Sequence, residues 1–279
     1  MLLVDAMPLL YWGLVMLPKL FINGFACLTG DAAPEDFAPF VEVRKLRRAE
    51  QISKNVLLCA FRALEQAKLK DGPRADLAIS LAMGAGALES TLKFMDSIIE
   101  DGDELSSPTA FASSVHNSTA LFLSMFLGIH GPCVVTGQLD ASFGAALLTA
   151  QQFLAKDMCE QVLVAVTEDV NPLLVEVLQK DPHVFDPFVY QPHLPATRLA
   201  GAWVVSKKPT AATQFVLDSI ELSTTVDVRT QTQPLLPVHS CAHSVLLLAN
   251  HLEQKKDFSL REQFAGTILK IAGKPYVCA

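Results

Sequence analysis

Residues 130–154, HGPCVVTGQLDASFGAALLTAQQFL, constrain the fold more than any other stretch, because they join a core strand to a helix of small residues. Gly131 and Pro132 predict a turn, residues 133–136 have the β-branched content of a buried strand, and residues 141–153 predict a helix rich in alanine and leucine. A strand-to-helix junction of this kind can hold a catalytic residue. Asp140 stands at the turn itself, so the role of this carboxylate is the first question that the sequence poses.

The bulk composition predicts an acidic, globular protein. The 279 residues are 51% hydrophobic and carry a formal net charge of -7, which supplies ample core material and argues against nucleic acid as a partner. The six cysteines are scattered without a CxxC pair, which favours reduced thiols and a cytoplasmic location. Residues 1–18 are apolar but contain Asp5 and Pro8, so we expect a packed arm or a misassigned start rather than a membrane segment.

Short strands alternate with helices through the rest of the chain, which predicts an α/β protein with a parallel or mixed sheet and helices on both faces. Gly84 and Gly86 follow a predicted strand, but Glu89 occupies the third glycine position of a dinucleotide-binding turn, so a tight turn is the better interpretation. We expect loops at 31–39 and 101–114. The predicted strands are 19–28, 77–81, 133–136, 161–166, 200–205, 215–222 and 267–272, and the predicted helices are 44–67, 88–100, 117–127, 141–153, 173–178 and 241–252.

The order of these motifs resembles a known family. Asn117 before an apolar helix, Gly131-Pro132, the elbow, QVLVAVTEDV and AGAWVVSKK are together similar to the N-terminal half of a β-ketoacyl synthase of the thiolase superfamily. KLFINGFACLTG, VRKLRRAEQISK, ELSSPTAFASSVHNSTA and SFGAALLTA resemble the short β-ketoacyl-synthase-like, or chain-length-factor-like, proteins of aryl polyene pathways. The resemblance covers residues 21–205, and beyond it only VHSCAHSVLLLANHL is weakly similar to the C-terminal half.

The resemblance implies a cysteine at the elbow that holds the acyl chain, and two histidines from the C-terminal half that assist condensation. Eight residues on from Pro132 the chain has Asp140 instead, and a carboxylate does not replace a thiolate as an acyl carrier. The histidine-containing HGTGT loop is absent from the sequence as well. Because it lacks both features, the chain resembles the inactive partner subunit of a ketosynthase heterodimer. The resemblance implies that such a subunit shapes the tunnel that limits acyl-chain length.

Residues near the elbow each have a plain and a functional interpretation. Asp140 is a preferred N-cap type, and it could also block acylation or bind a pantetheine arm. Phe143 fits the core or a gate that closes the tunnel. Ser142 in ASFG partly resembles a nucleophile elbow, but Asp140 replaces its first glycine. Cys133 is expected to be an inert buried thiol, with a displaced nucleophile as the alternative.

Three further groups are candidates for a pocket, a metal site and a docking surface. His116 and Asn117 precede a helix, where Asn117 fits an N-cap and either residue could line a pocket. His239 is the best candidate for the second ketosynthase histidine, and its spacing from His243 suits a metal. No carboxylate or third ligand sits at helical spacing apart from His251, so we expect no metal. The basic residues Arg44, Lys45, Arg47 and Arg48 form a solvated helix end or a docking patch for an acidic acyl carrier protein.

We therefore predict a thiolase-like layered α/β domain over residues 19–279, with a complete N-terminal half at 19–205 and a reduced C-terminal half at 206–279. The expected function is a non-condensing, chain-length-factor-like subunit in polyene, polyketide or fatty-acid-like chain assembly, which pairs with a full-length ketosynthase through the strand at 133–136. No cofactor is expected beyond the phosphopantetheine arm of an acyl carrier protein. Two alternatives stay open: a small acyltransferase or thioesterase that uses Ser142 or Cys133 with His239, and a homodimeric acyl-binding protein.

Overall fold

A computed structural model describes residues 17–69, 72–138, 141–168, 198–224, 241–264 and 267–277. The strands are β1 (Leu20–Thr29), β2 (Leu77–Ala82), β3 (Cys133–Thr136), β4 (Gln161–Glu168), β5 (Leu199–Ser206), β6 (Phe215–Thr224), β7 (Phe258–Phe264) and β8 (Thr267–Pro275). The α-helices are α1 (Gln51–Gln66), α2 (Leu88–Asp101), α3 (Pro108–Ser114), α4 (Asn117–Leu127), α5 (Ser142–Ala155) and α7 (Cys241–Glu253). Short 3-10 helices are η1 (Pro34–Phe37), η2 (Val43–Leu46) and η3 (Asp103–Leu105).

The strands form one mixed sheet in the order β3-β2-β4-β5-β1-β6-β8-β7. Strands β3, β2 and β4 are parallel, whereas every pairing from β4 onward is antiparallel. The central strands β2, β4 and β5 are buried along their whole length except at Gln161, which explains why their sequences are continuous apolar runs. The predicted mixed sheet with helices on both faces is confirmed.

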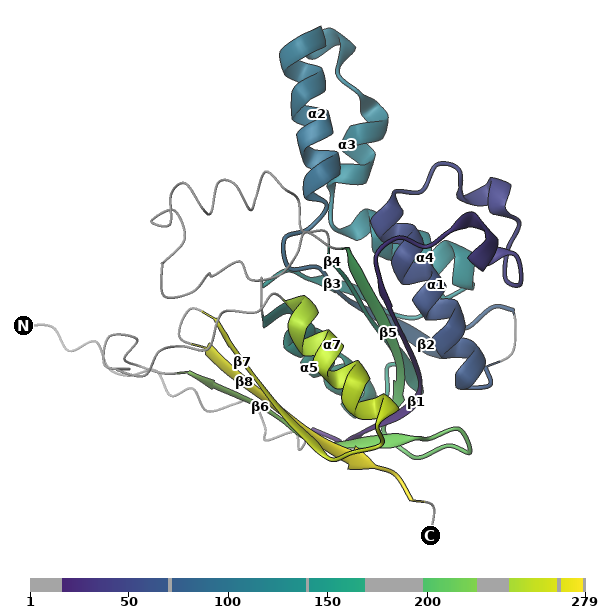
Figure 1. Cartoon of the computed structure of the whole chain (residues 1–279), viewed down its shortest axis with the longest axis vertical. Coiled ribbons are helices and arrows are strands. Elements are labelled where there is room, and N and C mark those ends of the chain that lie inside the picture. Colours follow the sequence, from purple (N-terminus) through teal and green to yellow (C-terminus); the bar gives the residue numbers. More distant parts are fainter. Residues whose placement is uncertain are drawn as a thin grey trace, which may run out of the picture.

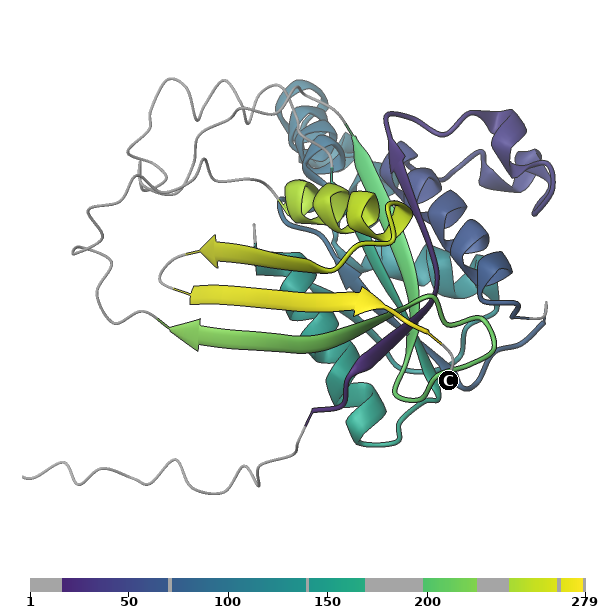
Figure 2. The ribbon, with the colours of Figure 1, turned by 60° about the horizontal axis from the view of Figure 1, so that its bottom comes forward.

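The elements stack in layers, as Figures 1 and 2 show. Helices α1 and α4 cover one face of the strands β1 to β5, and α5 and α7 cover the other. Strands β6, β8 and β7 then curve round so that α5 and α7 lie between the two parts of the sheet (Figure 2). The small residues of α5 let its backbone lie close to the sheet. The buried Ser80 hydroxyl of β2 donates to the Ala146 carbonyl of α5 at 2.8 Å, which shows how near the two elements are.

A bulge in β1 bends the sheet round the enclosed helices. The register of β1 against β5 shifts between Ile22 and Gly24, at the fully buried Asn23. The Asn23 amide is satisfied there: its nitrogen donates to Ser206 Oγ at 2.9 Å, and its oxygen accepts from the hydroxyls of Thr210 and Thr213 at 3.0 and 2.6 Å. Because these three partners lie in β5 or the turn after it, the amide ties the bulge to β5 just after Leu20–Ile22, the residues of β1 that also pair with β6.

The second part of the sheet has a polar outer side. Asp218 sits at a register shift in β6 and forms ion pairs with Lys19 and Lys274 at 2.6 and 3.6 Å. Glu221 faces Lys270 across the β6–β8 pairing, and both side chains are exposed. Ile271 of β8, in contrast, is buried in the core with α5 and α7. The alternation shows that this part of the sheet packs helices on one side and carries charges on the other.

Three predicted boundaries are wrong. Residues 101–114 are not a loop, because Ser107 Oγ accepts the Ala110 N–H at 3.2 Å and Pro108 occupies the first position of α3. Residues 31–39 include η1, in which Asp36 accepts the Ala33 N–H. The basic residues near 44–48 do not open the long helix, since they lie in and after η2 and α1 begins at Gln51.

The C-terminal region holds one strand more than predicted. The sequence FSLREQF of β7 interrupts its apolar alternation with charged residues, and its hydrogen bonds to β8 decide its structure. The predicted short helix at 173–178 lies outside the described residues, as does the apolar arm up to residue 16. Among the helices of the described ranges, none has the length and apolar character needed to cross a bilayer.

Gly24→Ala should destabilise the fold strongly, because β1 touches α1 at this point. An added Cβ would lie 2.2 Å from the Ala63 carbonyl oxygen and 2.7 Å from the Ala67 nitrogen, and neither backbone atom can move aside cheaply. We expect a loss of about 3 kcal/mol in the free energy of unfolding, measured by urea denaturation. Gly30→Ala is the control: its added carbon meets nothing within 4 Å, so only the cost of a positive φ, about 1 kcal/mol, remains. Equal losses in the two variants would contradict the close-contact explanation.

Candidate functional site

The elbow between β3 and α5 is held together by Ser142. Its hydroxyl oxygen accepts the Gln138 N–H at 2.8 Å, and its carbonyl accepts the Thr136 hydroxyl at 3.2 Å. Ser142 is fully buried, so its side chain closes the turn and has no access to solvent. The sequence picked out Ser142 as a weak nucleophile candidate, and the structure places it in a structural hydrogen bond instead.

Helix α5 begins one residue later than predicted. Ala141 occupies the N-cap position and makes no side-chain cap hydrogen bond, so Asp140 precedes the cap. The predicted N-cap role of Asp140 is therefore wrong, because Ala141 holds that position. Asp140 itself lies outside the described residues, and its other proposed roles stay predictions. Phe143 is fully buried, with its ring centroid 5.0 Å from that of Trp203 on β5. This contact explains Phe143 as core, while its predicted gating role stays untested.

His116 lies beside the elbow in a slot between two glycines. A Cβ on Gly86 would lie 2.3 Å from His116 Nε2, and one on Gly137 would lie 3.6 Å from the same ring. Gly86 also has a φ of +75°, so this position requires glycine for two reasons. The predicted tight turn at 84–86 is thus confirmed, and the group that approaches it is an imidazole. Glu168, at the end of β4, accepts the N–H groups of Gly84 and Ala85 and fixes the turn.

His116 and Asn117 line a surface pocket of about 570 Å³ between α4 and β3. Both were predicted as pocket candidates, and both side chains are exposed. The predicted N-cap at Asn117 is wrong, because Asn117 is the first helical residue and His116 occupies the cap without a side-chain bond. His116 already has helical φ and ψ of −55° and −34°, so the chain enters α4 without the extended cap geometry that a capping side chain needs. The other lining residues are Ala120, Leu121, Ser124, Cys133 and Val135.

Cys133 is exposed, which corrects the prediction of a buried thiol. The reason is topological: β3 is the first strand in the sheet order, so Cys133 lies at an edge beside the pocket. Partial burial against the pocket wall raises the pKa of the Cys133 thiol. A raised pKa leaves little thiolate at neutral pH, and this disfavours Cys133 as a nucleophile.

An apolar surface surrounds this edge. Leu121 and Met125, one turn apart on α4, are 61% and 71% exposed, and Val134 on β3 is 37% exposed. We call these three residues and Cys133 the β3–α4 face. The N–H groups of Ile79 on β2 and of Met83 just after it donate to the carbonyls of Pro132 and Thr136. By alternation, the N–H groups of residues 133 and 135 point away from β2. The face therefore combines apolar side chains with backbone donors that no other strand of the described ranges pairs.

The remaining predicted site residues lie elsewhere or outside the described residues. Arg44, Lys45, Arg47 and Arg48 are all exposed around η2, and Arg44 forms an ion pair with the neighbouring Glu42. His239 lies outside the described residues, as does the side chain of His243. Within the described ranges, no group of three or more His, Cys, Asp or Glu side chains could hold a metal ion.

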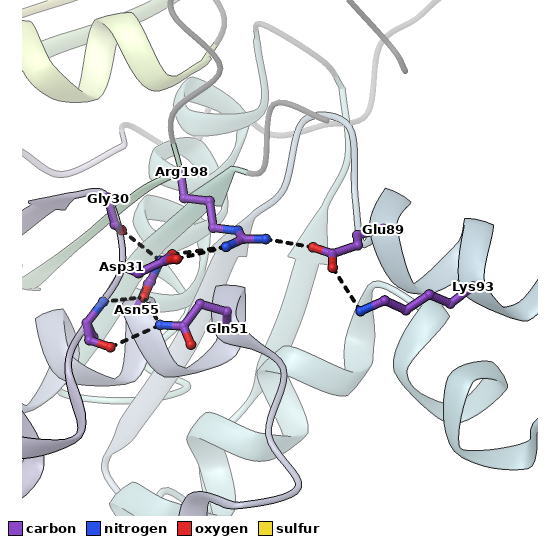
Figure 3. Close-up of polar contacts among 8 residues, drawn as sticks. Gly30, Asp31, Gln51, Asn55, Glu89, Lys93 and Arg198 are labelled. Carbon is purple, nitrogen blue, oxygen red and sulfur yellow. Dashed lines mark hydrogen bonds and ion pairs between the residues drawn. The ribbon is translucent and has the colours of Figure 1, made fainter. Parts of the chain in front are cut away.

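Sequence reasoning missed a polar network at the carboxyl ends of the strands (Figure 3). Arg198, just before β5, donates to both oxygens of Asp31 at 2.9 and 3.2 Å and to Glu89 on α2 at 2.7 Å. Glu89 also pairs with Lys93 at 2.8 Å. The buried Asn55 of α1 holds the adjoining turn through the Gly30 carbonyl and the Ala32 N–H. Arg198 is 167 and 109 residues away from its partners, so no local spacing could reveal the network.

Comparison with solved structures identifies the class of fold. The AntDE–AntF complex, a type II polyketide synthase acyl carrier protein with its ketosynthase, matches with a TM-score of 0.74 at 12% identity, over 94% of this chain and 100% of that chain. The ishigamide ketosynthase/chain length factor matches with 0.71 at 10%, over 93% and 100%. The ketosynthase ApeO with its chain length factor ApeC from Xenorhabdus doucetiae matches with 0.60 at 16%, over 91% and 99%. The fold is thus the thiolase-like fold of ketosynthases.

The sequence shows the family. The model of the β-ketoacyl synthase N-terminal domain matches residues 28–263, and the chain therefore belongs to this family. The resemblance inferred from the sequence motifs is confirmed. The match extends beyond residue 205, where we expected a reduced C-terminal half to begin, and that division stays a prediction. A search of curated proteins found no match.

Alkylation of Cys133 should be slow at neutral pH although the thiol is exposed. Because its pKa is raised, the thiolate fraction should grow about tenfold per pH unit up to and beyond pH 9. Iodoacetamide labelling followed by peptide mass spectrometry measures this rate, with Cys133→Ser as the blank. Burial raises the pKa of Cys27 and of Cys159 to about 11, so these two should react more slowly. Fast labelling of Cys133 below pH 8 would revive the nucleophile hypothesis.

The Glu89 ion pairs should stabilise the attachment of α2 in a pH-dependent way. The hydrogen bond from Lys93, assisted by the charge of Arg198, lowers the pKa of Glu89. A lowered pKa means that the stabilisation is present above the unfolded-state pKa and is lost as the pH falls through the folded-state value. Glu89→Gln should speed amide exchange in α2 at pH 7, by an amount that reflects about 0.5 kcal/mol for a partly exposed pair. The difference from wild type should begin to shrink below the unfolded-state pKa of about 4.3 and vanish as the pH falls through the lowered folded-state pKa. A difference that does not shrink as the pH falls would exclude the charge as its cause.

Proposed function

We propose that this protein is a non-condensing subunit that pairs with a full-length ketosynthase during polyene or polyketide chain assembly. Family membership supports a ketosynthase-like subunit. The observation that carries the proposal is the β3–α4 face, an apolar strand edge beside the elbow that no other strand of the described residues covers. An open edge of this kind pairs readily with another chain, so a protein that keeps one needs a partner to cover it.

The chemistry of the elbow favours a subunit that does not condense acyl chains. Asp140 stands where the family resemblance implies the acyl-carrying cysteine. The other two candidate nucleophiles are poorly placed, because Ser142 is buried in a backbone hydrogen bond and the pKa of Cys133 is raised. A partner that supplies its own cysteine and histidines would remove the need for any of them.

The pocket on the same face suggests what pairing with a ketosynthase achieves. Its wall combines apolar side chains of α4 and β3 with the polar groups of His116 and Asn117. Because the pocket opens on the β3–α4 face, a subunit seated there would enclose it and convert it into a cavity at the interface. We propose that the acyl chain of the partner reaches this cavity, whose size then limits chain length.

The exposed basic residues 44–48 are proposed as the docking patch for the acyl carrier protein. They cluster on a chain whose net charge is -7, so they form a local positive field that an acidic carrier would follow. Two of the structurally similar proteins are a ketosynthase–carrier complex and a ketosynthase–chain length factor complex, which supports both proposed partners.

Val135→Pro should abolish pairing with the ketosynthase. The substitution removes an N–H that points away from β2, so it blocks strand pairing at the free edge without breaking the β2–β3 ladder. Val135→Ala is the matched control, because it trims the side chain but keeps the N–H. Each variant is co-expressed with every full-length ketosynthase of the source genome, and the purified complexes are weighed by native mass spectrometry.

We expect a one-to-one complex with wild type and Val135→Ala and free subunits with Val135→Pro. A wild-type homodimer that binds none of the ketosynthases would overturn the proposal and favour the homodimeric alternative. Incubation with an acyl-carrier thioester should leave the intact mass of this chain unchanged. An adduct that Cys133→Ala removes would point to an acyltransferase.

A further inference from the structure

Helices α2 and α3 form an arm that projects from the layered body (Figure 1). The arm spans residues 88–114, and Ser90 is its one fully buried residue. The two helices contact each other through Phe94 and Phe111, whose ring centroids are 5.2 Å apart. An arm with so little burial gains almost nothing from the protein core, so packing within this chain does not explain its place in the fold.

The arm exposes large apolar side chains. Met95 and Ile99, four residues apart on one face of α2, are 48% and 76% exposed, and Leu105 in η3 is 73% exposed. Phe111 on α3 is 55% exposed even though it contacts Phe94. Single exposed apolar residues are ordinary, but four within 17 residues of a projecting element indicate a surface that another molecule covers.

The same element is strongly acidic. Residues 88–114 contain six acidic residues and a single basic one, Lys93, which gives a net charge of −5 within a chain of net charge -7. Glu100, Asp101, Asp103 and Glu104 gather at the end of α2 and in η3, between the exposed Ile99 and Leu105, and all four are exposed. The surface that fits the tip must therefore be basic and must offer apolar contacts.

The arm joins the body beside the proposed pairing face. Arg198 anchors Glu89 in the first turn of α2, and α3 leads through Val115 and His116 directly into α4, which carries Leu121 and Met125. The base of the arm thus borders the pocket and the β3–α4 face. A subunit seated on that face would meet the arm as well.

We propose that the α2–α3 arm is a second docking element, which seats its apolar, acidic tip on a basic surface of the same ketosynthase that pairs along β3. This inference rests on the proposed function, since it takes its partner from there. An acidic carrier protein does not fit, because the tip would repel it. The carrier patch at 44–48 and the arm therefore serve partners of opposite charge.

The test measures association with the full-length ketosynthase that co-purifies with wild type, by surface plasmon resonance at about 50 and about 500 mM NaCl. Glu100→Lys/Asp103→Lys should slow association about tenfold at low salt and much less at high salt, because the tip steers the encounter. Ile99→Ser should speed dissociation about tenfold at both salt concentrations, since it removes a desolvated contact. Both variants should fold, because the arm contributes no core side chain beyond Ser90.

Matched controls lie at the opposite end of the sheet. Glu65→Lys/Glu160→Lys reverses two exposed charges outside the arm, and Met158→Ser trims a side chain that is 48% exposed. Both should change the rates less than twofold. If the arm variants behave like these controls while Val135→Pro abolishes binding, the arm inference is wrong and the proposed pairing stands. If wild type binds no ketosynthase, both fail.

Discussion

The buried amide of Asn23 is the interaction on which the layered fold depends. It holds the bulge in β1 that follows the residues paired with β6, and its three shortest hydrogen bonds are made to side chains of β5 or of the turn after β5. Because the sheet bends at this bulge, it covers two sides of α5 and α7, and one core joins Trp203 and Phe143 to Phe258 and Ile271. An unsatisfied amide at this depth would cost about 1–3 kcal/mol, so the bulge requires its partners.

This arrangement decides where the site can be. With α5 enclosed on two sides, its N-terminus can open only toward the carboxyl ends of β2, β3 and β4, where the elbow, the Gly84–Gly86 turn and Glu168 meet. Since β3 is also the last strand at that side of the sheet, the elbow, the pocket and the free edge are neighbours. A partner that pairs with the edge therefore also covers the pocket, so pairing and site chemistry are coupled by geometry.

The parts of this fold that local patterns encode could be predicted. Apolar runs located β2, β4 and β5, and the spacing of small residues located α5. Short-range signals that compete with composition were harder to read, as in α3, where Ser107 and Pro108 specify a helix start inside a polar stretch. Contacts between residues distant in the sequence could not be predicted from local patterns, because they follow from strand order, which no local spacing encodes. Three examples are the slot that Gly86 and Gly137 provide for His116, the exposure of Cys133 at a sheet edge, and the Arg198 network.

Charge is distributed unevenly over this acidic chain, and the structure gives the distribution a meaning. Residues 44–48 gather basic side chains near η2, while the arm gathers acidic ones at its tip, and neither group is consumed by ion pairs within the described residues apart from Arg44 with Glu42. At an ionic strength of about 0.15 M a field of either sign fades within about 8 Å, so each group acts on whatever docks directly upon it. Two surfaces of opposite sign can thus recognise two partners on one subunit without competition, because each repels the partner that the other attracts.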